Sequence, residues 1–83
     1  MYSLLYIYKG GIMKNRIREL RKLNKITQEE LSKQVGVSRQ SIIAIESGKF
    51  NPSLELAYNI SKAFNSTIEE VFIFEEGRMN DGD

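Results

Sequence analysis

The stretch that decides the fold is TQEELSKQVGVSRQSIIAIESGKFNPS, residues 27–53. Thr27 and Glu30 have the spacing of a capping box, in which each side chain bonds the backbone N–H of the other residue. We therefore expect a helix to begin at Gln28. Gly36 is expected to end it, because glycine adopts a positive φ without strain.

A second helix is expected almost directly after the first. Ser38 is a favoured N-cap residue, and Gly48 is placed to end the helix. Helices with so short a connection must cross steeply. Ser32 is small enough for one helix to pass closely over the other. The apolar contacts expected between them come from Leu31, Val35, Val37, Ile42 and Ile45.

Three further helices are expected around this pair. One covers residues 15–24, one follows the turn at residues 51–53, and one follows a second capping box at residues 67–70. Their core-facing positions are predicted to be Ile17, Leu20 and Leu23, then Leu56, Ala57, Ile60 and Phe64, then Ile68, Val71 and Phe72. The pattern predicts an all-α domain of five short helices on one core, at residues 13–76.

The two ends of the chain fall outside this pattern. Residues 1–12 are interpreted as an extension, either a short strand or a segment upstream of a natural start at Met13, and residues 77–83 as a flexible acidic tail. The apolar opening, residues 1–8, is far shorter than the roughly 20 residues of a membrane span and lacks the basic start of a signal peptide. No membrane partner is expected.

Residues 71–74 are four consecutive apolar residues, more than one face of a surface helix can bury. Two arrangements could bury the remaining apolar surface. One is a short strand near residues 72–75 that pairs with residues 13–15, and the other is helix packing across a two-fold axis. Both predict a homodimer with Phe72, Ile73 and Phe74 at its interface. The alternatives are that Phe74 covers the first helix, or that residues 1–8 cover the patch and leave a monomer.

The composition excludes much chemistry. Cysteine and histidine are both absent, which removes thiolate and imidazole nucleophiles and Cys/His zinc sites. An enzyme, a cofactor and a metal are therefore not expected. The charge is divided unevenly, because residues 1–50 hold ten Lys/Arg against four Glu, and residues 51–83 hold two against seven acids. The first part is the candidate for binding an anion such as nucleic acid.

The second helix of the pair carries the candidate binding residues. Once its apolar face is assigned to the core, Arg39, Gln40, Ile43 and Ala44 remain toward solvent near its start. Arg pairs with guanine edges, Gln with adenine edges, and small or apolar groups with the thymine methyl. The free N–H groups at Gln28 would bind a phosphate, with Lys49 and Asn51 placed for others.

Residues 13–76 resemble the phage-repressor and Cro type of helix-turn-helix regulator, the XRE family. The resemblance implies a lambda-repressor-like fold, a homodimer on a palindromic operator in double-stranded DNA, and a buried ion pair between Arg21 and Glu46. It makes Arg39, Gln40 and Ala44 base-facing, with Ile43 beside them. The positions implied to contact the DNA backbone are Thr27, Gln28, Ser38, Ser41, Lys49 and Asn51.

The sequence thus predicts a cytoplasmic, nucleoid-associated transcriptional regulator of bacterial, archaeal or phage origin, with repression as the expected mode. Two alternatives keep the same fold. One is the antitoxin of a toxin-antitoxin pair, with a toxin or regulatory protein as partner. The other is a protein-interaction module without DNA binding, against which Arg39, Gln40 and Ala44 argue, because acidic or bulky residues would be expected there.

Overall fold

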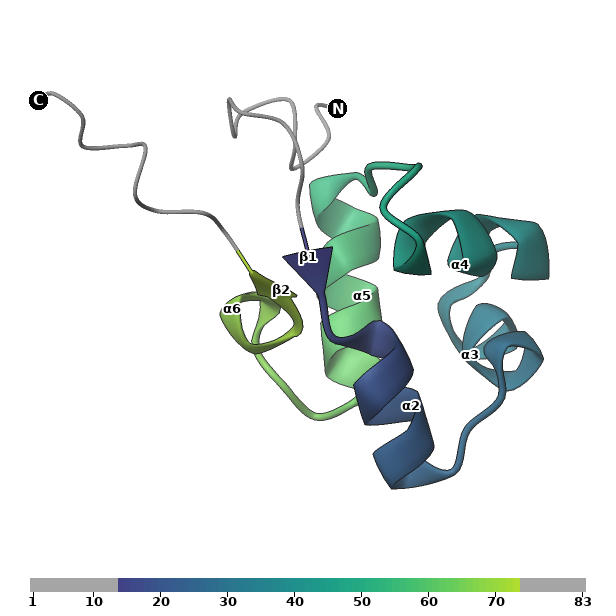
Figure 1. Ribbon diagram of the computed structural model, residues 1–83, viewed down its shortest axis with the longest axis horizontal. Helices are drawn as coiled ribbons and strands as arrows, with labels where there is room; N and C mark the ends of the chain where they lie inside the picture. Colours follow the sequence, from purple (N-terminus) through teal and green to yellow (C-terminus); the bar gives the residue numbers. More distant parts are fainter. Residues whose placement is uncertain (1–13, 74–83) are drawn as a thin grey trace, which may run out of the picture.

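The computed structural model describes residues 14–73 (Figure 1). The predictions for residues 1–12 and 77–83, and for Met13 and Phe74, lie outside this range. The elements are β1 (Lys14–Asn15), α2 (Ile17–Asn24), α3 (Gln28–Val35), α4 (Arg39–Glu46), α5 (Leu54–Ala63), α6 (Ile68–Val71) and β2 (Phe72–Ile73). Five helices and one short strand pair thus make up the described part, which confirms the predicted fold class.

One core joins all five helices. Its buried apolar residues are Ile17, Leu31, Ile42, Ile45, Ala57, Ile60, Phe64, Val71 and Phe72. Leu20, Val35, Val37, Leu56 and Ile68 pack against it while remaining partly exposed. In Figure 1, α5 runs through the middle of the molecule, with α6 on one side and the α3–α4 pair on the other, and α2 lies at its lower end. The α3–α4 pair is therefore held by a core built around α5.

The two capping boxes form as predicted. The Thr27 hydroxyl accepts from the Glu30 N–H at 3.0 Å, and the Glu30 carboxylate accepts from the Thr27 N–H at 2.8 Å. The same pair of bonds links Thr67 and Glu70 at the start of α6. At the other end of α3, Gly36 adopts a φ of +78°. These local signals set the starts of α3 and α6 and the turn into α4.

The first helix begins two residues later than predicted. Asn15 belongs to β1, and its side-chain oxygen accepts from the Ile17 N–H at 3.1 Å. Its amide nitrogen donates to the Ile45 carbonyl at 3.0 Å, which ties β1 to the end of α4. Asn15 is thus occupied as a strand residue and as a link to α4, and α2 starts after it.

The C-terminal apolar run turns into a strand. β2 pairs antiparallel with β1, with Lys14 opposite Ile73 and Asn15 opposite Phe72. This confirms the strand alternative for the described residues. Phe72 is only 1% exposed and lies in the domain's own core. Its assignment to a dimer interface is therefore wrong, because the strand turns this ring inward and leaves it no surface for a partner. Ile73 is half-buried.

Leu23 is also corrected, since its side chain is 70% exposed rather than part of the core. The last turn of α2 extends beyond the end of α5, where no other helix lies against it (Figure 1). Helical spacing places Leu23 on the same apolar face of the helix as Ile17, but this face continues beyond the end of the core. Within residues 14–73, no helix is long and apolar enough to cross a membrane.

Candidate DNA interface

The helix α4 separates a buried face from an open one. Ile42 and Ile45 are fully buried against the other helices. Arg39 and Gln40, in its first turn, are exposed, and the next two predicted positions, Ile43 and Ala44, are half-buried. The first turn therefore presents a guanidinium and an amide to solvent from a backbone that is anchored by core packing. Such groups suit hydrogen bonding to base edges.

The start of α4 adds two hydroxyl groups to this face. The Ser38 hydroxyl accepts from the Ser41 N–H at 3.1 Å and caps the helix. The hydroxyl oxygens of Ser38 and Ser41 lie 3.1 Å apart, so the two side chains stand together at the helix N-terminus. They supply polar groups beside Arg39 and Gln40 at the end of α4 that would enter a groove.

The chain reverses sharply at the other end of α4. Gly48 has a φ of +84°, and the N–H groups of Lys49 and Phe50 both donate to the Ala44 carbonyl, at 2.9 and 3.2 Å. This turn leaves the side chains of Lys49 and Asn51 exposed. Of the predicted backbone-contacting residues, Ser38 thus lies before the predicted base-facing positions of α4, and Lys49 and Asn51 lie after them.

A buried ion pair links the helices behind this surface. The Arg21 guanidinium of α2 binds the Glu46 carboxylate of α4 with Nε at 2.5 Å from Oε2 and a second nitrogen at 3.3 Å from Oε1. The side chains of Arg21 and Glu46 are only 12% and 3% exposed. A third nitrogen of Arg21 donates to the Ile26 carbonyl at 3.1 Å. The pair therefore holds α2, the α2–α3 connection and α4 together.

Gln28 joins the same network, which sequence reasoning missed. Its side-chain amide donates to Glu46 Oε1 at 3.1 Å, so the first residue of α3 is bonded to the last residue of α4. Arg18 lies 3.9 Å from the same oxygen but is 70% exposed. No local sequence signal marks either contact, because the partners are far apart along the chain. The contact leaves the side chain of Gln28 occupied and its position fixed.

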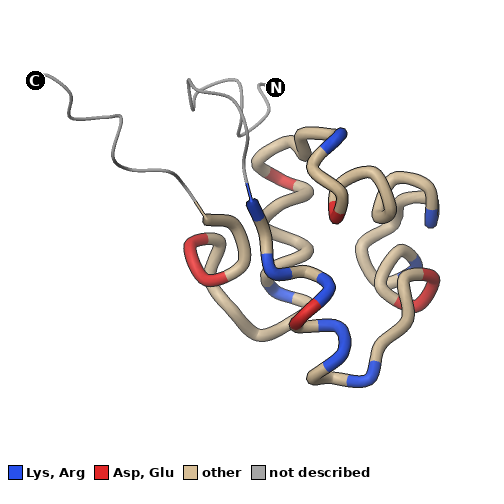
Figure 2. The backbone as a smooth tube through the Cα atoms, viewed as in Figure 1, with Lys and Arg blue, Asp and Glu red and all other residues tan. Residues whose placement is uncertain are grey.

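Cations outnumber acidic residues on α2, which holds Arg18, Arg21 and Lys22 against Glu19. Figure 2 shows Lys and Arg along α2 and at the turn after it, and Arg39 adds a cation at the first position of α4. Glu69 and Glu70 lie in α6, on the opposite side of α5 from the α3–α4 pair. Within residues 14–73, no three acidic side chains gather closely enough to hold a metal ion. The exposed donors and cations on the α4 side therefore suit an anionic partner.

Comparisons with known proteins agree with this geometry. The helix-turn-helix family model HTH_3 matches residues 17–71. A protein of Archaeoglobus fulgidus named as an uncharacterized HTH-type transcriptional regulator is 55% identical over 67 residues, which cover 81% of this chain and 94% of that protein. Another of that description, from Methanocaldococcus jannaschii, is 55% identical over 64 residues, 77% of this chain and 97% of that protein.

A solved structure shows the same arrangement of helices. It is the crystal structure of a protein from Bacteroides fragilis described as a candidate DNA-binding protein, with a TM-score of 0.67 and 26% identity over 74% of this chain and 98% of that one. The chain belongs to the XRE-type helix-turn-helix family of DNA-binding transcriptional regulators. The α3–α4 pair is its helix-turn-helix.

Proposed function

We propose that the protein is a sequence-specific repressor that reads the major groove with the first turn of α4, as a homodimer on a palindromic operator. The observation that carries this proposal is the division of α4 between buried Ile42 and Ile45 and exposed Arg39 and Gln40. A helix fixed on one face by the core presents its other side chains in a constant geometry. Constant geometry is what discrimination between base edges requires.

The proposed contacts divide into two kinds. Arg39, Gln40, Ile43 and Ala44 contact base edges, while Thr27, Gln28, Ser38, Ser41, Lys49 and Asn51 contact the backbone. The exposed position of Lys49 beyond the end of α4 supports its separate role. Backbone contacts position the protein on any duplex, whereas base contacts distinguish one duplex from another. The two kinds can therefore be separated by experiment.

We expect Arg39→Ala and Gln40→Ala each to weaken binding to the preferred site by about 1 to 3 kcal/mol and to relax base preference there. Lys49→Ala should instead weaken binding to all sequences alike, and should lower the salt slope by about one. The preferred site comes from selection of bound duplexes from random DNA with the unaltered chain. Affinities are then measured on that site and on a scrambled duplex.

The comparison between duplexes is the decisive part of this experiment. If Arg39→Ala weakened the scrambled duplex as much as the selected site, Arg39 would be a backbone contact. If the unaltered chain enriched no site even at low salt, sequence-specific binding would be refuted and an interaction module of the same fold favoured. Leu23→Ala is a suitable control, because Leu23 is exposed on α2 away from the α3–α4 pair.

The homodimer is proposed on the size of the recognition surface. α4 has eight residues, so it spans only about 12 Å and can read few base pairs. Two copies related by a two-fold axis would double the site, with half-sites about 34 Å or 10 base pairs apart. With Phe72 buried, the proposed interface is formed by Ile73, the last residue of β2, and by Phe74, which follows it in the sequence.

We expect the full chain to sediment as a dimer at high micromolar concentration and Phe74→Asp to sediment as a monomer, because a carboxylate at an apolar interface is costly to desolvate. Leu23→Asp is the control, and it should leave the dimer intact. A strictly monomeric full chain that binds a palindromic site without cooperativity would defeat the dimer proposal.

The repressor assignment is the simplest action of a domain that covers the major groove, because a bound protein there blocks access to a promoter. A reporter placed behind a promoter that contains the selected site tests it. Expression should fall when the chain is supplied and recover with Gln40→Ala. An increase in expression would make the protein an activator.

A further inference from the structure

A row of cations lies beside the helix-turn-helix, on a helix that the proposed contacts do not use. A groove open to solvent runs between α2 and the start of α3, and reaches the start of α4. Its cationic lining comes from Arg18, Arg21, Lys22 and Lys25 on one side and Arg39 on the other. Its lining also includes Ile26, Thr27, Gln28 and Glu29, around the start of α3. We call it the α2 groove.

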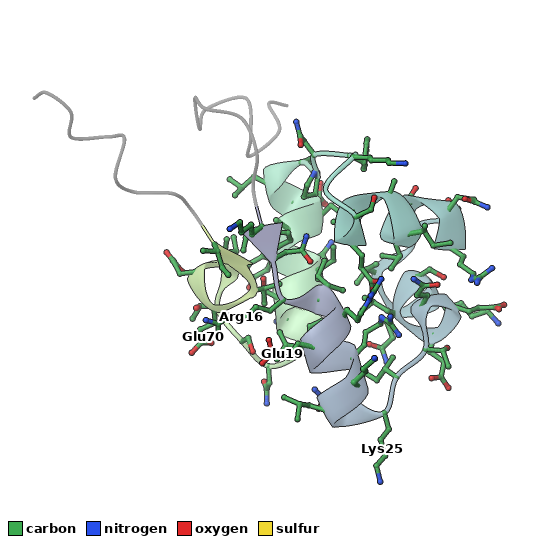
Figure 3. The ribbon with its side chains drawn as sticks, viewed as in Figure 1. Arg16, Glu19, Lys25 and Glu70 are labelled. Atoms are coloured by element: carbon green, nitrogen blue, oxygen red, sulfur yellow. The ribbon has the colours of Figure 1, made fainter. Side chains whose placement is uncertain are left out.

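The spacing of these residues along α2 explains why they gather. Arg18, Lys22 and Lys25 are four and then three residues apart, so they share one face of the helix. Glu19 and Arg16 lie on the other side, toward α6 (Figure 3). Lys25 follows the end of the helix with a φ of +56°, and its side chain extends away from the core (Figure 3). The helix therefore turns a continuous cationic stripe toward the groove.

Of the four lining cations on and directly after α2, three are free to bind a ligand. Arg21 is committed to Glu46, and Arg18 approaches the same carboxylate only to 3.9 Å while 70% exposed. Lys22 and Lys25 are exposed and form no ion pair within residues 14–73. The acidic residue of the lining, Glu29, lies 3.8 Å from Lys33. The groove thus keeps a positive excess that nothing within the described residues neutralises.

We propose that the α2 groove is a second contact with DNA, which binds the phosphate backbone beside the base pairs that α4 reads. From Arg18 to Lys25 the helix advances roughly 10 Å. Measured along the axis of a DNA duplex, that length holds about three phosphates of one strand, at about 3.4 Å of axis for each. Arg39 and Gln28 lie both on this groove and on the proposed recognition surface, so the two surfaces are continuous. This inference rests on the proposed DNA-binding function.

Long exposed cations on a polar surface suit phosphates better than a protein partner. They provide charge without the apolar anchor that a stable protein interface needs at its centre. Each phosphate neutralised releases condensed counterions, so each contact adds about 0.9 to the slope of log affinity against log salt concentration. The same contacts carry no base preference. We therefore expect removal of the groove cations to change the slope of log affinity against log salt concentration without changing the sequence preference.

The test uses Arg18→Gln, Lys22→Gln and Lys25→Gln, singly and combined, in the full chain. The salt slope is measured on the selected duplex and on a scrambled duplex. Each single change should reduce the slope by about 0.9, and the combined variant by about 2 to 3, on both duplexes alike. The ratio of the two affinities should stay at the unaltered value. Thermal unfolding followed by circular dichroism verifies that each variant is folded.

The matched control removes charge without touching the groove. Arg16→Gln combined with Lys62→Gln takes two cations from the domain, one on the α6 side of α2 and one beside Tyr58 on α5. Its slope should stay within about 0.3 of the unaltered value, because neither residue lines the groove. An equal fall in the control would mean that net charge acts at long range, and would overturn the assignment to the groove.

The outcomes separate this inference from the function on which it rests. If the unaltered chain prefers the selected duplex but the combined variant keeps the full slope, the groove does not bind DNA while the proposed function stands. If the chain shows no preference between duplexes but the combined variant still lowers the slope on both, sequence-specific reading fails and the groove contact holds. Absence of binding to any duplex at low salt would overturn both.

Discussion

Replacing either Arg21 or Glu46 alone should destabilise the domain more than any change at its surface. We expect Arg21→Met and Glu46→Leu each to lower the free energy of unfolding by about 3 to 5 kcal/mol, because each leaves its charged partner buried. The penalty should be larger for an unpaired Glu46, because its side chain is only 3% exposed. Its carboxylate accepts from both Arg21 and Gln28. Urea unfolding followed by circular dichroism measures the loss.

The combined variant should lose far less than the sum of the two single losses, because it buries no charge. It will still leave the Gln28 amide and the Ile26 carbonyl without their partners, so we expect a residual loss of about 1 to 3 kcal/mol. Arg18→Gln is the matched control, because its guanidinium approaches the same carboxylate while 70% exposed. It should change stability by about 0.5 kcal/mol or less. Additive losses in the double-mutant cycle would mean that the pair is not coupled.

The second large effect is expected at Phe72. Its replacement tests whether this side chain belongs to the core of one chain or to an interface between two. Phe72→Ala should lower the free energy of unfolding by about 3 to 5 kcal/mol, because it removes a fully buried ring and leaves a cavity. A domain of this size has a total stability of only about 5 to 15 kcal/mol, so Phe72→Leu, with a smaller loss, provides a variant that remains folded. Both losses should be the same at low and high protein concentration.

Independence of concentration is the informative result, because the contact lies within one chain. A contact across a dimer would make the loss vary with protein concentration. Leu23→Ala is the control, and it should cost clearly less, since Leu23 is 70% exposed. Stability unchanged by Phe72→Ala would contradict the placement of the ring in the core.

Part of the proposed binding surface could be predicted from the sequence because it follows from one helix. Arg39 and Gln40 were predicted to face solvent once Ile42 and Ile45 were assigned to the core, and both are exposed. The α2 groove was not predicted, although its cations are spaced at helical intervals. A stripe of cations has the same sequence pattern whether it faces bulk solvent or a groove, so only the position of α3 and α4 distinguishes the two.

The sequence by itself determined the features that form between residues close together along the chain. Thr27 with Glu30, Thr67 with Glu70, and the positive φ of Gly36 depend on local hydrogen bonds and backbone sterics, so the starts of α3 and α6 and the tight turn follow directly. Only the tertiary structure decided that Leu23 is exposed, that Phe72 is buried within its own domain, and that Gln28 contacts Glu46. Leu23 lies in the last turn of α2, which extends beyond the end of α5, and Phe72 turns inward because β2 pairs with β1. Burial of a side chain depends on which distant elements lie against it, and no local pattern contains that information.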